Sequence, residues 1–274
     1  MYISIDLGGT NTRVASSKDL KSIYKKEKFT TDHTIDAERN LIKEAILKVS
    51  ESEKIEAVCI GVPGIVDKEN QKFGKIINIP SLSNLEYFEL IAESFNCNRI
   101  VADNDAALAG LGEAVFGAGQ KYEAVAYLTL STGVGGVRVA NKKLDPTQKF
   151  YEPGNMVIIG DGVDLPISAL PGTFTAYSSG TGFKQNYKVL PEECEDPAIW
   201  VDYAEKLSWG INNVNVMWAP DVIVIGGGMA KSLSKFIDPL YQNLFKNKFF
   251  EIPPILKAEL EDDSGLFGGF ALLS

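Results

Sequence analysis

An internal similarity between two glycine-rich segments is the feature that most constrains the fold of this chain. Residues 2–15 read YISIDLGGTNTRVA and residues 127–140 read YLTLSTGVGGVRVA, each a strand pattern, a Gly-rich turn and a second strand that begins Arg-Val-Ala. A second pair, AVCIGVPGI at 57–65 and DVIVIGGGM at 221–229, places a glycine turn after an apolar strand. This repetition predicts a duplicated α/β domain; the alternative is chance similarity between glycine-rich hairpins.

Apolar residues between these segments recur with helical spacing, as an alternation of strands and helices requires. The predicted helices cover residues 36–52, 105–117, 197–218 (opened by Pro197) and 266–273. The segment 141–196 shows no clean period, so we expect loops with short strands there.

Two domains follow from this pattern. We expect an N-terminal α/β domain at 1–118 and a C-terminal α/β domain at 119–263, with a cleft between them. The last helix, about 264–274, is expected to pack back on the N-terminal domain.

Composition excludes several classes of protein. Hydrophobic residues make up 45% and charged residues 23% of the 274 positions, which suits a folded globular protein. The net charge of −9 argues against a nucleic-acid or anionic-membrane partner, and no apolar run reaches the roughly 20 residues of a membrane span. Cys59, Cys97 and Cys194 lie far apart, which predicts free thiols in a reducing compartment. With no leader pattern after Met1, we expect a cytoplasmic protein.

The first glycine turn has the composition of a phosphate-binding loop. Two adjacent glycines let the backbone approach a ligand, and successive N–H groups can hold an anion. Asp6 ends the preceding strand, where its carboxylate could hold Mg²⁺ through water. A plain β-hairpin turn is the alternative. The residues predicted to contact nucleotide here are Asp6, Gly8, Gly9, Thr10, Asn11 and Thr12.

The two later turns extend the prediction. The second turn offers Ser131, Thr132, Gly133 and Gly135 as a second phosphate cradle, and two facing cradles would hold a triphosphate. The turn Gly226-Gly227-Gly228 leaves room for an adenine or ribose, although, taken by itself, it is better explained by a tight strand-to-helix crossover. Neither a Walker A loop nor a GxGxxG dinucleotide motif is present.

Asp105 is the predicted catalytic residue. The segment IVADND places Asp103, Asn104 and Asp105 at a helix start, where the helix dipole favours an ionised carboxylate. Such a carboxylate can align an attacking hydroxyl for phosphoryl transfer. Because Asp and Asn are common helix caps, one of the three is expected to serve only as a cap, and we assign that role to Asp103.

The ordered set DLGGTNTR, GVPGIVD, NIPSL, NDAALAGLGEA, STGVGG and VIVIGGG resembles the ROK family of sugar kinases and related proteins, over nearly the whole chain. The resemblance implies an actin-like/ribonuclease-H-like ATPase fold and transfer of the ATP γ-phosphate, with Mg²⁺, to a hexose hydroxyl, usually the 6-hydroxyl. It implies Asp105 as catalytic base and Gly64, Asn78 and Asn104, besides Asp105 itself, as sugar-binding residues. A homodimer is also a family expectation.

The chain departs from the family pattern beside the sugar. Many ROK kinases carry Glu-x-Gly-His, whose His also ligates a structural zinc, but this chain has Glu152-Pro153-Gly154-Asn155. No cysteine follows in the next segment, and Thr175 stands where a Glu is common. We therefore expect no zinc, with Glu152 and Asn155 lining an altered sugar pocket. A glucokinase is the first hypothesis; an N-acetylmannosamine, N-acetylglucosamine or other sugar kinase, or a non-catalytic sensor derived from a kinase, is the alternative.

Overall fold

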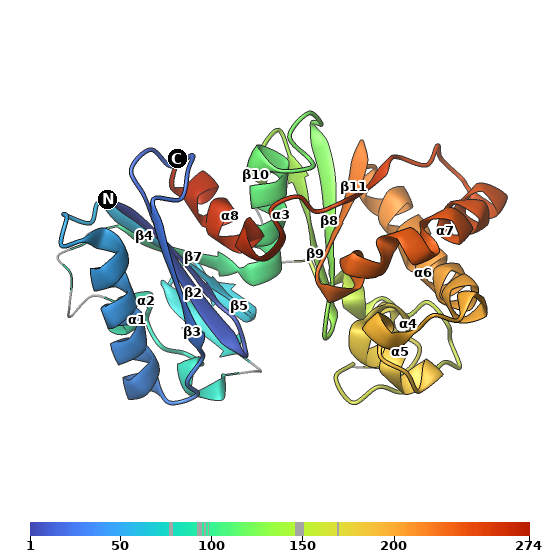
Figure 1. Cartoon of the computed structure of the whole chain (residues 1–274), viewed down its shortest axis with the longest axis horizontal. Coiled ribbons are helices and arrows are strands. Elements are labelled where there is room, and N and C mark those ends of the chain that lie inside the picture. The colour runs from blue at the N-terminus through green and yellow to red at the C-terminus, as the bar shows by residue number, and fades with distance from the viewer. Residues whose placement is uncertain (77–78, 92–94, 96, 98, 146–150, 169) are drawn as a thin grey trace. The chain divides into compact units, whose positions relative to one another are not determined.

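The computed structural model describes residues 1–76, 79–91, 95, 97, 99–145, 151–168 and 170–274 (Figure 1). The chain forms two compact units. Unit 1 comprises Met1–Gln120, Leu144–Phe150 and Asp262–Ser274, and unit 2 comprises Lys121–Lys143 and Tyr151–Glu261.

Unit 1 is a five-stranded sheet with the order β3-β2-β1-β4-β7, plus a small β5-β6 hairpin. Its strands are β1 (Tyr2–Leu7), β2 (Asn11–Ser17), β3 (Lys25–Thr30), β4 (Ala57–Val62), β5 (Gly64–Asp67), β6 (Lys72–Ile76) and β7 (Ile100–Asn104). Its helices are α1 (Ile35–Ser50), α2 (Tyr87–Ile91), α3 (Asp105–Phe116) and α8 (Ser264–Leu273), with short 3-10 turns at Pro80–Leu82 and Glu261–Asp263.

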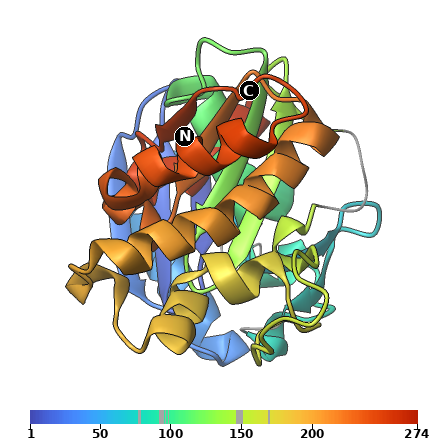
Figure 2. The same cartoon turned by 90° about the vertical axis from the view of Figure 1, so that its right-hand side faces the viewer.

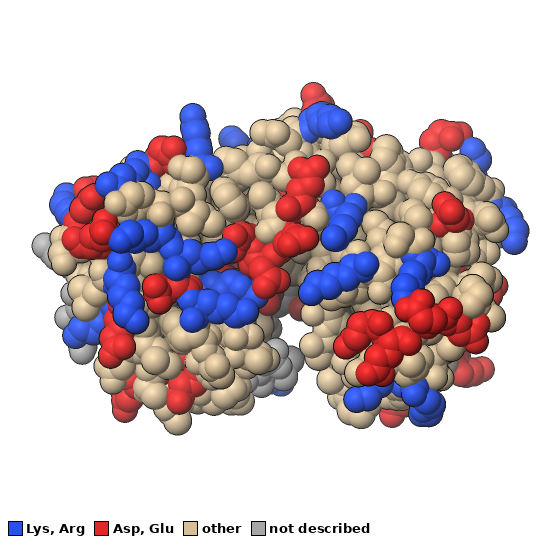
Figure 3. All heavy atoms as spheres, in the orientation of Figure 1, with Lys and Arg blue, Asp and Glu red and all other residues tan. Residues whose placement is uncertain are grey.

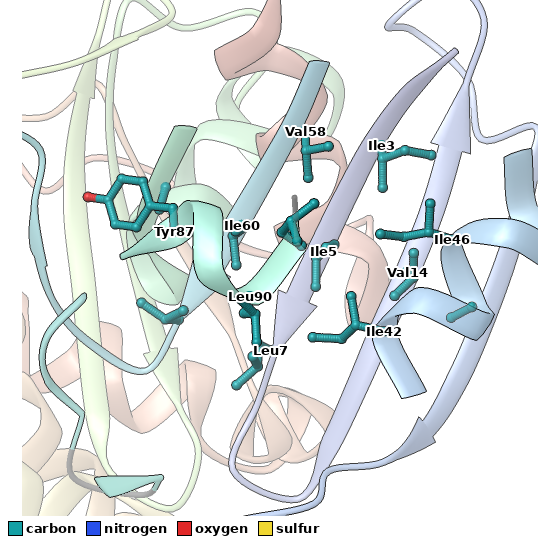
Figure 4. Packing of buried hydrophobic residues seen from close by; sticks show 14 of the residues in the cluster. Ile3, Ile5, Leu7, Val14, Ile42, Ile46, Val58, Ile60, Tyr87 and Leu90 are labelled. Carbon is teal, nitrogen blue, oxygen red and sulfur yellow. The ribbon is translucent and has the colours of Figure 1, made fainter. Parts of the chain in front are cut away.

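Both faces of the unit 1 sheet are covered, which explains the continuous apolar run AVCIGV of β4, all six residues of which are buried. Ile3, Ile5 and Leu7 of β1 point to the same side as Ile42 and Ile46 of α1 (Figure 4). Ser4 of β1 and Cys59 of β4 lie on the opposite face of the sheet and pack against α8. The sheet is therefore the middle layer between α1 and the pair α3 and α8.

Unit 2 has a sheet with the order β10-β9-β8-β11-β12. Its strands are β8 (Ala124–Leu130), β9 (Val134–Ala140), β10 (Lys143–Leu144), β11 (Val222–Gly226) and β12 (Ile255–Lys257). Its helices are α4 (Phe174–Ser178), α5 (Gly180–Tyr187), α6 (Pro197–Trp218) and α7 (Leu233–Asn247), with 3-10 turns at Pro153–Asn155, Pro191–Glu193 and Gly228–Ser232. Figure 2 shows α6 and α7 side by side, and buried Trp200, Tyr203 and Phe236 pack between them.

The internal similarity in the sequence corresponds to repeated structure. In both units an antiparallel hairpin, β1-β2 or β8-β9, pairs through its first strand with a parallel strand, β4 or β11. The matching arginines nevertheless differ in role. Arg13 lies opposite Asp6, whereas the Nε of Arg138 donates to the carbonyl of Trp218 at the end of α6, at 2.8 Å. The duplication prediction is confirmed at the level of strand order.

The long predicted helices are confirmed, but the prediction for 141–196 is partly wrong. α1, α3, α6 and α8 lie where helices were predicted, and α6 begins at Pro197. In 141–196, however, α4 and α5 replace the expected loops and short strands. They are capped by Thr173 and Ser179, whose side chains accept from Ala176 N and Gly182 N. Helices of five and eight residues are too short to show a period in the sequence.

Glycines bring α3 and α8 into backbone contact. A Cβ at Gly112 would collide with the carbonyl of Ser264, and one at Gly268 with the carbonyl of Leu108. Beside this contact, Ser264 Oγ donates to the buried Glu113 carboxylate at 2.9 Å. The chain's last helix is therefore an integral layer of unit 1.

A buried carboxylate fixes the β1-β2 turn to α1. Glu38 accepts from the Thr12 hydroxyl at 2.7 Å and from the Asp32 N–H at 2.7 Å. Thr31 donates from its hydroxyl to the carbonyl of Gly8 at 2.7 Å and from its N–H to the carbonyl of Thr10 at 3.0 Å. Burial raises the pKa of Glu38, and the hydrogen bond from Thr12 partly offsets that increase.

The surface carries mixed charge. On the face shown in Figure 3, Lys and Arg side chains lie among Asp and Glu side chains, in keeping with the modest net charge of −9. Across the described part of the chain, no helix combines the length and apolarity needed to cross a bilayer.

Gly268→Ala is predicted to destabilise the protein, because the added methyl group cannot fit against the backbone of Leu108. Overpacking of this kind costs about 1–3 kcal/mol, which urea denaturation should detect. Gly160→Ala is the control, since a Cβ there meets nothing within 4 Å. Equal midpoints for the two variants would contradict the tight α3-α8 contact.

Glu38→Gln is predicted to gain stability relative to the wild type as the pH rises from about 4 to about 8. The raised pKa means that the folded state keeps a proton on Glu38 that the unfolded chain has lost. In the wild type, the protonated Glu38 contributes stability that is fully present below the ordinary glutamate pKa of 4.5. This contribution is lost as the pH rises through the folded-state pKa of Glu38. The glutamine stays neutral throughout.

Thermal unfolding of both proteins across this pH range measures the effect, and only the change of the Tm difference with pH counts. Glu44→Gln, on the exposed side of the same helix, controls for the loss of one negative charge. A Tm difference between Glu38→Gln and wild type that is constant with pH would refute the interpretation.

Candidate active site

Three parallel strands of unit 1 end at one edge of its sheet. Asp6 of β1 lies beside Gly61 of β4, which lies beside Asp103 of β7. The carboxyl ends of neighbouring parallel strands are the usual ligand site of an open α/β sheet. The β1-β2 turn and the start of α3 are therefore brought to the same edge.

Asp105 occupies the first position of α3. Its Oδ1 accepts from the N–H of Ala106 at 2.8 Å, and the side chain is half-buried. The N-terminal end of the helix favours the ionised carboxylate at this position. Asp105 is thus held at the edge of the sheet as a charged acceptor.

The predicted cap at Asp103 is wrong, because Asn104 is the N-cap. The Asn104 Oδ1 accepts from the N–H of Ala107 at 3.1 Å, while Asp103 pairs with the Lys68 ammonium at 2.6 Å. Alternation along β7 directs the side chains of Asp103 and Asn104 to opposite faces. Of these two, Asn104 is the one directed at the first N–H groups of α3.

The predicted sugar-binding residues of unit 1 meet around Asn104. Its Nδ2 donates to the carbonyl of Gly64 at 3.2 Å, joining the GVPG turn to the start of α3. Gly64 itself is needed for the β5-β6 hairpin, since a Cβ would lie 2.6 Å from the carbonyl oxygen of Lys75. Asn78 lies outside the described residues.

The β1-β2 turn has an open side and a buried side. Thr10 is exposed and Gly8, Gly9 and Asn11 are half-buried, so their groups remain accessible to a ligand. Thr12 is fully buried and its hydroxyl is bonded to Glu38. The Thr12 side chain therefore holds the turn in place from below.

Asp6 is embedded in a cluster of charges. Arg13 donates to it at 3.3 Å and to Asp262 at 2.8 Å. Burial raises the pKa of Asp6, Arg13 opposes that shift, and the nearby carboxylates of Asp262 and Asp263 add to it. Arg13 is thus the main group that opposes the rise in the pKa of Asp6.

A magnesium ion fits this position. Mg²⁺ prefers carboxylate oxygens and retains several of its waters. Asp6 supplies such oxygens at the carboxyl end of β1, and the lack of a side chain at Gly265 keeps α8 from crowding them, since a Cβ there would lie 3.3 Å from Oδ1. Asp6 could hold the ion through water at this edge.

The corresponding turn in unit 2 is braced from one side. Ser131 and Thr132 are exposed, and Gly133 and Gly135 are half-buried. The Thr175 hydroxyl accepts from the N–H of Val134 at 3.3 Å, and the N–H of Gly180 donates to the carbonyl of Ser131 at 2.7 Å. The hydroxyl side chains of Ser131 and Thr132 therefore remain exposed while the backbone of the turn is held.

The three-glycine turn after β11 combines packing with open space. Gly227 has a φ of +79°, and a Cβ at Gly226 or Gly227 would strike Tyr127 or the carbonyl of Leu130. A Cβ at Gly228, by contrast, would meet nothing within 4 Å. Gly226 and Gly227 are thus explained by the strand-to-helix crossover. Gly227 and Gly228 are both exposed, and of the three glycines Gly228 alone has room for a Cβ.

Glu152 precedes a 3-10 turn in unit 2 next to β9, and Asn155 is the last residue of that turn. Asn155 Nδ2 donates weakly to Glu152 at 3.4 Å, and desolvation raises the pKa of Glu152. The following loop is held by the Val157–Thr173 bridge and by the Tyr177 hydroxyl, which accepts from the N–H of Val163 at 2.8 Å. Among the described residues, no three His, Cys, Asp or Glu side chains are grouped as a metal site.

The residues that support the β1-β2 turn and the β8-β9 turn were not predicted from the sequence. Glu38 and Thr31 hold the first turn, and Thr175 holds the second. One signal was available: Glu38 lies four residues before Ile42, on the apolar stripe of its helix. A charged residue on such a stripe indicates a buried polar network. Thr31 and Thr175 have no comparable signal.

Comparisons with known proteins agree with this arrangement. The ROK family model matches residues 2–274. The N-acetyl-D-glucosamine kinase of Histophilus somni is 29% identical over 307 residues, covering 99% of this chain and 98% of that protein. The glucokinase of Thermotoga maritima is 26% identical over 309 residues, covering 99% and 96%.

A solved structure shows the same fold. The ROK family glucokinase from Streptomyces griseus, in complex with glucose and AMPPNP, matches with a TM-score of 0.79 at 24% identity, covering 99% of this chain and 98% of that one. The predicted actin-like α/β fold class is confirmed. With a family model that matches from Tyr2 to the last residue, the chain belongs to the ROK family.

Proposed function

We propose that this protein is an ATP-dependent sugar kinase that transfers the γ-phosphoryl group to a hexose hydroxyl, the 6-hydroxyl in the first instance. The observation that carries the proposal is the carboxylate of Asp105. It stands at the N-terminus of α3, at the same sheet edge as a glycine turn with accessible backbone groups. The sugar kinases among its relatives support the same reaction class.

Each unit is assigned one set of contacts. In unit 1, Gly64, Asn104 and Asp105 would bind the sugar, and Gly8–Asn11 would bind phosphate oxygens through backbone N–H groups and hydroxyls. In unit 2, Ser131–Gly135 and Gly228 would bind the nucleotide, and Glu152 with Asn155 would contact sugar hydroxyls. Thr12, Gly226 and Gly227 are reassigned to supporting roles on the contacts described above.

Asp105 would act by positioning and by accepting a proton. A sugar hydroxyl that donates to its carboxylate is aligned with the γ-phosphorus, and its proton passes to Asp105 as the new P–O bond forms. Because the transition state of phosphoryl transfer is loose, alignment provides most of the catalysis. The hydrogen bond from Ala106 N and the dipole of α3 keep the carboxylate ionised until then.

Asp6 would hold Mg²⁺ through water, and the ion would neutralise phosphate charge. Arg13 also pairs with Asp6 and opposes the rise in the pKa of its carboxyl group that burial causes. Together they provide a positive potential beside the turn in a chain that is acidic overall.

The sugar is proposed to be glucose or an N-acetylated hexose, because the two relatives described above are named for these substrates. Asn155 in place of the family's histidine offers an amide that can both donate and accept. The three cysteines are free and buried, in keeping with a cytoplasmic enzyme.

Asp105→Asn is predicted to lower kcat by at least about 100-fold, because the amide keeps the shape but cannot accept the proton. ADP release with D-glucose, N-acetyl-D-glucosamine and N-acetyl-D-mannosamine measures turnover, and the dissociation constant for ATP is expected to stay unchanged. Asp36→Asn, in the first turn of α1, is the matched control. Wild-type turnover in Asp105→Asn, or no turnover of any sugar by the wild type, would count against the proposal.

Removal of zinc is predicted to leave activity and Tm unchanged. The segment after Asn155 has no cysteine, and hydrogen bonds and apolar contacts hold the loop instead. Dialysis against a strong zinc chelator followed by return of Mg²⁺ tests this, while omission of Mg²⁺ should abolish turnover. Activity that is lost on dialysis and restored only by Zn²⁺ would show that the loop needs the metal.

A further inference from the structure

A cavity lies within unit 2, between α6, α7 and the loop after the 3-10 turn at Pro153–Asn155. Its volume is about 360 Å³, within the range of about 300–1,000 Å³ typical of small-molecule sites. The lining residues are Val157, Ile158, Ser208, Trp209, Asn212, Asn213, Asn243 and Leu244. None of the residues assigned above to sugar, phosphate or nucleotide is among them.

The polar groups of this cavity come from one face of α6. Trp209, Asn212 and Asn213 are spaced i, i+3 and i+4, so their side chains share that face. All three are half-buried. Within the described structure, the indole N–H and both amides make no hydrogen bond. Partly buried polar groups are normally satisfied, so the cavity offers hydrogen-bonding groups that a ligand could use.

The lining also defines the chemistry of the ligand. All eight lining residues are uncharged, although the chain carries 27 basic and 36 acidic residues. A phosphorylated or otherwise charged ligand would lose its hydration there without a counter-charge. A neutral ligand with several hydroxyl groups fits, because an amide donates and accepts side by side and thus matches neighbouring hydroxyls.

The remaining walls are apolar. Val157, Ile158 and Leu244 line it together with the amides, and Trp209 adds an aromatic ring. A pyranose has this combination of polar edge and apolar C–H face, and an aromatic ring is suited to contact the latter.

We propose that this cavity is a second binding site for an unphosphorylated monosaccharide, separate from the residues assigned to catalysis. The site binds the neutral sugar and excludes its phosphate ester. The claim concerns binding alone and does not require that the protein be a kinase.

Binding to the full chain is measured by isothermal titration calorimetry and by tryptophan fluorescence, with D-glucose, N-acetyl-D-glucosamine and glucose 6-phosphate as probes. The test variant is Asn212→Leu/Asn213→Leu. The matched control is Gln242→Leu, an exposed amide on α7 next to the lining residue Asn243. We expect at least one of the two neutral sugars to bind the cavity, and the double variant to weaken that binding at least tenfold, about 1.4 kcal/mol. The control should bind as the wild type does.

Trp209→Phe provides a second readout that keeps an aromatic ring in place. The other two tryptophans, Trp200 and Trp218, are buried at 2% and 8% exposure, so the sugar-induced fluorescence change should be lost with Trp209. The proposal is overturned if neither neutral sugar binds the wild type at this site. Unchanged sugar isotherms in the double variant overturn it, as does a fluorescence response that persists in Trp209→Phe. Equally tight binding of glucose 6-phosphate at this site overturns it as well. The experiment measures binding and not turnover, so its result does not depend on whether the protein proves to be a kinase.

Discussion

The parallel pairing of β1, β4 and β7 is the constraint on which the candidate site depends. It ends three strands at one edge and so brings Asp6, the GVPG turn and the start of α3 together from segments about a hundred residues apart in the chain. Burial of both sheet faces, by α1 on one side and by α3 and α8 on the other, fixes this register. A one-residue slip would turn the isoleucines of β1 toward α8. The hydrophobic core thereby sets the geometry of the polar edge.

Charge placement at this edge follows from two carboxylates with different partners, half-buried Asp6 and fully buried Glu38. Asp6 is balanced by Arg13, whereas Glu38 is satisfied by hydrogen bonds from Thr12 and from the backbone of Asp32. The first arrangement places Arg13 beside the Asp6 carboxyl group. The second ties the turn to α1 and so holds its backbone groups, the proposed phosphate donors, in place. Phosphoryl transfer depends on such fixed donors, because they do not have to reorganise during the reaction.

Much of this could be predicted from the sequence, because the relevant signals are local. Gly-rich turns after apolar strands indicated both hairpins, and regular apolar spacing with Pro197 indicated α6. The predictions failed where tertiary contacts decide. The choice of Asn104 over Asp103 as the cap depends on which side chain faces α3 and which faces Lys68. Likewise the burial of Thr12 depends on a partner 26 residues away. α4 and α5 are stabilised by caps and packing and have no helical period of their own.

The central claim is that Asp105 receives the proton of a sugar hydroxyl directed at the γ-phosphorus of ATP. A crystal structure of the protein with the bound sugar and a non-hydrolysable ATP analogue tests it most directly. The account predicts one sugar hydroxyl within about 2.6–3.2 Å of an Asp105 carboxylate oxygen, with that same hydroxyl in line with the terminal phosphorus. A sugar bound with no hydroxyl near Asp105, or with its phosphate-facing hydroxyl held by another residue, would contradict it.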